Sequence, residues 1–95
     1  MEKIVRIISQ SPLATRQYID GKGNERVVNS VSFRLTDGVD EFVAEITGER
    51  AVNFPKLDYM HNYAVQCTMG VREWTSQQGE LQLTNKIYIN KINVI

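Results

Sequence analysis

Hydrophobic and polar residues alternate along most of the chain, with the period of two that is typical of strands having one buried and one solvated face. The clearest example is the C-terminal third, where alternating runs at 65–74 and 81–92 flank a polar loop at 75–79. The loop ends in glycine, which is typical of a short hairpin connection. The faces predicted to be buried carry Val65, Cys67, Met69 and Val71 in the first run, and Leu81, Leu83, Ile87 and Ile89 in the second.

Three further strands are predicted at 3–9, 25–35 and 40–47. The first has aliphatic residues on both faces, which predicts either burial on both sides or a bend between two sheets. Ser11 and Pro12 interrupt it, since proline has no ladder N–H. Residues 15–19 are extended again and lead into a glycine-rich turn at 20–24, and Asp37-Gly38 marks a hairpin turn between the second and third strands. The side chains predicted to face the core of those two strands are Val31, Phe33, Leu35, Phe42, Ala44 and Ile46.

Residues 49–58 are the one predicted helix, limited to one or two turns because Pro55 lies within it. The predicted order is therefore three strands, a short helix and two strands. Five antiparallel strands with a helix between the third and fourth are typical of the OB-fold, a small Greek-key barrel. We therefore expect an all-β protein in which residues 1–95 form a single OB-fold domain.

Composition excludes several classes of protein. No apolar run approaches the ~20 residues of a membrane-spanning helix, and the N-terminus lacks the features of a signal peptide. The single cysteine, Cys67, excludes an internal disulfide and suits the reducing cytoplasm. Because Cys67 lies on the apolar face of its strand, we expect a buried and unreactive thiol.

The net charge is zero, but the charges are segregated along the chain. Residues 1–34 hold six basic and three acidic side chains, residues 35–49 hold five acids and no base, and residues 50–95 hold five bases and three acids. If the first and last thirds meet in space, they form a mildly basic face. The acidic run from Asp37 to Glu49 is expected to be a solvated edge, because in a groove it would oppose phosphate binding.

No catalytic or metal-binding pattern is found. His61, the one histidine, has no nucleophile or carboxylate partner at a recognisable spacing. His61 and Cys67 alone do not complete a structural zinc site, which needs four ligands. Gly21 and Gly23 belong to a hairpin turn and do not precede a helix, as a phosphate-binding loop would. The sequence therefore predicts neither an enzyme nor a cofactor.

Several short stretches resemble the OB-fold of bacterial and phage single-stranded DNA-binding proteins. They are residues 4–8 with Ser11-Pro12, residues 31–35, residues 41–48 with Arg50-Ala51, and residues 71–74 with Gly79. The chain departs from this family at Thr47, where a tryptophan is usual, and at Pro55 in the helix. The resemblance implies binding of single-stranded DNA, or else RNA, with little sequence preference, in replication, repair or recombination. It also implies a homo-oligomer, a dimer or tetramer, whose natural interface is the edge of the first strand.

Binding of this kind combines aromatic faces for stacking bases with cations near the phosphates. In OB-folds these groups come from the second and third strands and from two loops. The residues that we expect to bind nucleic acid are Arg16, Tyr18, Lys22, Arg26, Arg34, Arg72, Trp74, Lys86 and Tyr88.

Each of these residues also has a purely structural interpretation. Trp74 is alternatively a cap on a barrel end or part of a dimer contact, Tyr18 a loop anchor, and Tyr88 a half-buried strand residue. The cations are alternatively solvated surface. The competing function is a protein-interaction or assembly module that binds no nucleic acid, with Trp74 as an anchor.

Overall fold

The structure is a computed structural model that describes all 95 residues. It is an all-β fold with six strands in one sheet and one short helix. The elements are β1 (Glu2–Gln10), β2 (Ala14–Ile19), β3 (Glu25–Thr36), β4 (Glu41–Thr47), α1 (Glu49–Val52), β5 (Asn62–Thr75) and β6 (Leu81–Val94). The helix has four residues, so no helix of this structure could cross a membrane.

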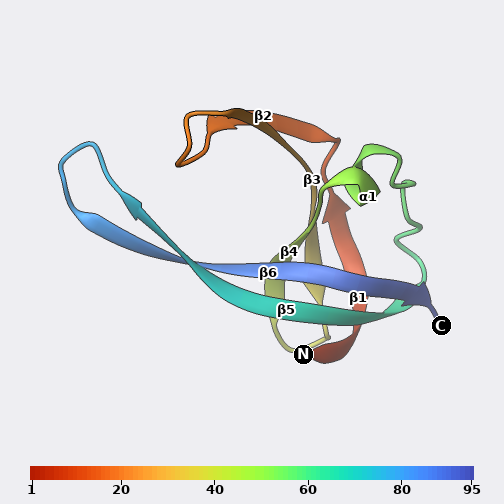
Figure 1. The fold of residues 1–95 in the computed structure, drawn as a ribbon. Helices are drawn as coiled ribbons and strands as arrows, with labels where there is room; N and C mark the ends of the chain where they lie inside the picture. The colour runs from red at the N-terminus through yellow and green to blue at the C-terminus, as the bar shows by residue number, and fades with distance from the viewer.

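The first strand, β1, pairs with two other strands of the sheet (Figure 1). Its first half, from Glu2 to Arg6, pairs with β5, and its second half, up to Gln10, pairs with β3. The register shifts between Ile7 and Ser9. Burial on both faces is therefore wrong, because Ile4 is 62% exposed, and the expected bend between two sheets is instead a change of partner within one six-stranded sheet.

The paired strands follow the order β1-β5-β6-β4-β3-β2. In addition β1, the first strand in this order, pairs with β3, the fifth. The link between β4 and β6 is parallel and consists of the single pair Glu45–Tyr88. All other pairings are antiparallel.

The predicted number of five strands is wrong by one. The extended segment near Thr15 is a strand of its own, β2, which pairs with β3 from Ala14–Ser30 to Ile19–Glu25. Every residue of β2 is exposed. Since none of its side chains reaches the core, the hydrophobic pattern in this segment carried too little information to identify the strand.

The helix is a single turn at the start of the predicted range, which agrees with the expected one or two turns. It ends at Val52, well before Asp58, and the chain that follows is irregular. Phe54 in that irregular segment packs edge-on against Phe33, with ring centroids 5.7 Å apart and planes at 82°. The segment thus covers one end of the core with an aromatic pair in a preferred geometry.

The core is a cluster of twelve buried residues drawn from five strands and the helix. It consists of Val5, Ile7, Val31, Phe33, Leu35, Ala44, Ile46, Ala51, Tyr63, Val65, Cys67 and Ile89. Most residues that were predicted to face the core are in it, and Phe42 is half-buried against it. Four others are exposed, because the distal half of the β5–β6 hairpin extends beyond the core: Met69, Val71, Leu81 and Leu83.

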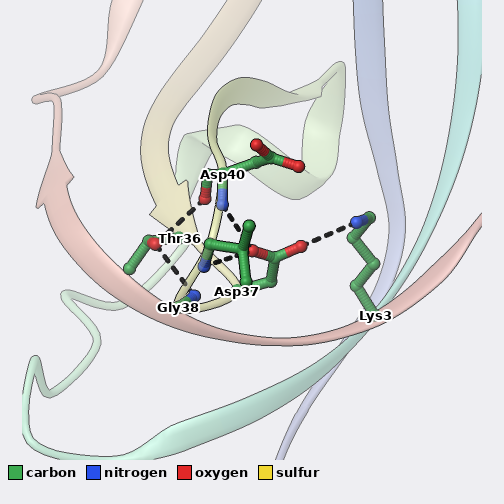
Figure 2. Close-up of polar contacts among 6 residues, drawn as sticks. Lys3, Thr36, Asp37, Gly38 and Asp40 are labelled. Atoms are coloured by element: carbon green, nitrogen blue, oxygen red, sulfur yellow. Dashed lines mark hydrogen bonds and ion pairs between the residues drawn. The ribbon is translucent and has the colours of Figure 1, made fainter.

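The turn between β3 and β4 is held by one carboxylate, as Figure 2 shows. Asp37 Oδ1 accepts hydrogen bonds from the backbone N–H groups of Val39 and Asp40, and its Oδ2 lies 2.8 Å from Lys3 Nζ on β1. The lysine and these two N–H groups hold the pKa of Asp37 well below its usual range. Gly38 supplies the positive φ of 96° that this predicted turn requires.

Candidate functional site

Two hairpins project from the core toward the same side of the molecule, to the left in Figure 1. One is the β2–β3 hairpin, whose turn is closed by Asp20, and the other is the distal half of the β5–β6 hairpin. Gly23, at φ 80°, and Gly79, at φ 82°, supply the left-handed positions of the two turns. The first and last thirds of the sequence therefore lie across from one another.

The register of each hairpin determines which side chains share a face, because paired residues of antiparallel strands point to the same side. On the β2–β3 hairpin, Arg16 pairs with Val28. On the β5–β6 hairpin, the face opposite the core carries Arg72, paired with Thr84, and Lys86, paired with Gly70. These are the faces that the alternating pattern predicted to be solvated.

A cleft lies between the two hairpins, with β4 as its third wall. The hollow between the hairpins has a volume of about 480 Å³. A second hollow of about 220 Å³, lined only by residues of the β5–β6 hairpin, extends the cleft toward the tip of that hairpin, and Arg72 and Lys86 line both. The residues that line the cleft are Arg16, Val28, Glu45, Thr47, Arg72, Trp74, Thr84, Lys86 and Tyr88. Five of the nine predicted binding residues are thus brought together.

The two aromatic side chains that line the cleft, Trp74 and Tyr88, are both at least partly exposed to solvent. Trp74 is 46% exposed, and its indole N–H donates a hydrogen bond to Thr84 Oγ1 across the hairpin at 3.1 Å. This bond holds an indole that is not part of the buried cluster, so Trp74 does not cap the core. Tyr88 is half-buried on β6 and lies on the same face of the hairpin as Lys86 and Trp74.

Three cations face one carboxylate in the cleft. Arg16, Arg72, Lys86 and Glu45 all line it, and none of them takes part in an ion pair within 4.0 Å. The cleft therefore has a surplus of positive charge in a chain whose net charge is zero. A negatively charged ligand would therefore contact cations that form no ion pair within the protein.

Four predicted binding residues lie outside the cleft. Tyr18 and Arg26 form a cross-strand pair farther along the β2–β3 hairpin, on the face that carries Arg16, and Lys22 lies in the turn at its end. Arg26 Nε lies 3.0 Å from Asp20 Oδ2, and this contact lowers the pKa of Asp20 together with two backbone N–H groups. The charge of Arg26 is therefore compensated by Asp20, and Lys22 is the cation that extends the basic face beyond the cleft.

Arg34 is the most distant of the four. It pairs with Val43 on β4, six residues along β3 from the cleft residue Val28. Its guanidinium lies 2.8 Å from Glu41 Oε1, so its charge is compensated locally. The geometry does not bring Arg34 to the other predicted residues.

Sequence reasoning missed four residues of the cleft: Val28, Glu45, Thr47 and Thr84. Three of them are neutral, and only the pairing register brings them beside the cations. The fourth, Glu45, belongs to the acidic run that was expected to be a solvated edge. That run is divided instead, since Asp37 binds Lys3, Glu41 binds Arg34 and Glu45 is half-buried in the cleft.

The cysteine and the histidine of the chain both lie outside the cleft. Cys67 is buried, and desolvation raises the pKa of its thiol, against the weaker opposing effect of the N-terminal charge. His61 Nε2 lies 3.4 Å from Asp58 Oδ2 in an exposed pair three residues apart, so the expectation that His61 has no carboxylate partner is wrong. No group of three or more His, Cys, Asp or Glu side chains comes together in a way that could hold a metal ion.

Neither the scan against protein-family models nor the search of curated proteins finds a match to this chain.

Proposed function

We propose that the protein binds single-stranded nucleic acid, DNA in the first place, in the cleft between the β2–β3 and β5–β6 hairpins. The observation that carries the proposal is the meeting of Arg16, Arg72 and Lys86 with Trp74 and Tyr88 in one open cleft. Cations supply phosphate contacts and aromatic faces supply base stacking, each base adding ~1–3 kcal/mol. Both are sequence-tolerant interactions.

The strand pairing supports a more specific fold. A first strand shared by β3 and β5, a helix between β4 and β5, and a parallel link between β4 and β6 are the arrangement that an OB-fold barrel requires. In this proposal β2 is an extension of the loop that joins the first two barrel strands. The binding cleft then lies where OB-folds bind oligonucleotides, between that loop and the hairpin of the last two strands.

The proposed function also implies a cellular location, a process and an oligomeric state. As a member of the single-stranded DNA-binding class, the protein would act in the cytoplasm in replication, repair or recombination. It would act as a homo-oligomer, a dimer or tetramer. RNA is the second ligand to test, because stacking and phosphate contacts do not by themselves select the sugar.

The test is a titration with fluorescent oligo-dT at low and moderate salt, with Trp74 emission followed in parallel. The expected result is binding that weakens steeply with salt, together with a change in the emission of the sole tryptophan. A duplex of equal length is the control, since the stacked bases of a duplex offer no free faces to Trp74. Absence of binding at low salt, in protein shown to be folded by circular dichroism, would contradict the proposal.

One observation favours a second function, a protein-interaction module. The opposite face of the projecting β5–β6 hairpin exposes four large apolar side chains, at Met69, Val71, Leu81 and Leu83. Apolar residues that gather on one exposed face are typical of protein contacts. A module of this kind would bind no oligo-dT, so the same titration separates the two functions.

A further inference from the structure

Glu45 is an unexpected residue in a site for an anionic ligand. Its side chain is half-buried in the cleft and takes part in no ion pair, although Arg16, Arg72 and Lys86 line the same hollow. Its neighbour across the β4–β6 link is Tyr88, and across β3–β4 it is Ser32. Glu45 and Tyr88 are thus neighbours in the sheet and line the same hollow between the two hairpins.

A carboxylate repels phosphates, so its presence weakens binding of the strand backbone unless another part of the ligand compensates it. On single-stranded DNA the base edges are the groups along the strand that offer hydrogen-bond donors to a carboxylate, whereas RNA also offers its 2′-hydroxyls. A base stacked on Tyr88 would present its edge toward the residue paired with Tyr88, which is Glu45. The unpaired carboxylate oxygens are therefore positioned to accept hydrogen bonds from a base edge.

The bases differ in what they offer to a carboxylate. Guanine presents two adjacent donors, N1–H and N2–H, on its Watson–Crick edge, which match the two oxygens of one carboxylate. Thymine presents a single N–H between two carbonyl oxygens, which the carboxylate repels. Cytosine and adenine present one amino group beside an acceptor nitrogen and are intermediate.

We propose that Glu45 reads a base edge in the cleft and makes the protein prefer single strands containing guanine over strands of thymine alone. This inference rests on the proposed function and adds to it a substrate preference larger than the modest one that differences in stacking strength supply. Arg16, Arg72 and Lys86 hold the backbone, Tyr88 stacks the base, and Glu45 is the specificity-determining residue.

The experiment compares two fluorescent 15-mers of equal charge, one of thymidine alone and one in which isolated guanosines replace every fourth thymidine. Isolated guanosines avoid quadruplex formation, and the equal number of phosphates removes the backbone contribution from the ratio of the two Kd values. The protein is tested as wild type, as Glu45→Gln and as Glu25→Gln. Glu25 is the matched control, since it is an exposed acid on β3 that faces away from Arg16.

We expect the wild type to bind the guanosine-containing strand at least about fivefold more tightly, the lower end of what a bidentate contact contributes. In Glu45→Gln the ratio should approach one, while binding of the thymidine strand becomes tighter because a negative charge is lost. Glu25→Gln should keep the wild-type ratio.

Two results would overturn the inference without affecting the proposed function: equal, salt-sensitive binding of both strands by the wild type, or a guanosine preference that survives in Glu45→Gln. Failure to bind either strand would overturn the proposed function and the inference together.

Discussion

The two halves of the β5–β6 hairpin have the same alternating sequence but opposite surroundings. In the proximal half, Cys67 and Ile89 form a cross-strand pair with only 3% of each residue exposed. In the distal half, Leu83 on the same face of β6 is 63% exposed. The proximal half is covered by other strands and the distal half is not. Alternation therefore sets the face on which a side chain lies, while burial depends on what lies opposite that face.

The largest difference between the halves should appear in stability. Ile89→Ala removes a buried side chain and should lower the free energy of unfolding by about 2–5 kcal/mol. Leu83→Ala, at an exposed position of the same strand, should change it by no more than about 0.5 kcal/mol. Urea unfolding measures both. Equal losses in the two variants would mean that the distal half is covered in solution, for example by a partner chain.

The next effect concerns binding by the distal half. Trp74→Ala should weaken binding of labelled oligo-dT by about 1–3 kcal/mol, because a stacking surface is lost. Trp74→Phe keeps an aromatic ring and should recover part of that loss. Because Trp74 is outside the buried cluster, both variants should unfold at the wild-type urea concentration. Unchanged affinity in Trp74→Ala would show that no base stacks there.

A smaller effect is expected from the cations of the cleft. Arg72→Ala should reduce the dependence of log K on log salt by about 0.7, the value for one phosphate contact on a single strand. Lys91→Ala is the matched control, because it removes one cation from β6 outside the cleft. Binding titrations at three or more salt concentrations measure the slopes. An equal reduction in both variants would indicate a diffuse charge effect and no localised contact.

The reactivity of cysteine thiols also compares the exposure of the two halves of the hairpin, without a substitution in the core. Burial raises the pKa of Cys67, so the native protein should react very slowly with a maleimide at neutral pH. The variant Val71→Cys adds a thiol to the exposed distal half, and that thiol should react rapidly. Mass spectrometry counts one adduct on the native variant and two in urea. Rapid labelling of Cys67 in the native wild type would contradict its burial.

The smallest effect on stability is expected at the turn between β3 and β4, which contains Asp37. The pKa of Asp37 is lower in the folded protein than in the unfolded chain, so its contribution to stability is present above the unfolded value, near 4, and is lost as the pH falls below it. Asp37→Asn should therefore lower Tm at pH 7, and the difference from wild type should shrink between pH 4 and pH 2. A difference that is constant over this range would exclude the carboxylate as its cause.

The candidate site was only partly predictable. Trp74, Arg72, Lys86 and Tyr88 follow from one alternating hairpin, so their common face was predictable from residue spacing alone. Arg16 joins them only because β2 pairs with β3 and the two hairpins project to the same side. Arg34 has the same charge and the expected outward direction, yet it lies too far along β3 and pairs with Glu41.

The sequence by itself determined local features: the alternation that assigns Val65 and Arg72 to opposite faces, and the glycines that shape the turns. These features depend on neighbours within a few residues, so they can be recognised without the rest of the chain. The burial of Cys67 was predicted, but the tertiary structure alone decided that Met69 on the same face is exposed and that Glu45 lies among the cations of the cleft. Burial and electrostatic surroundings depend on strands that are distant in sequence, and only the folded chain brings those strands together.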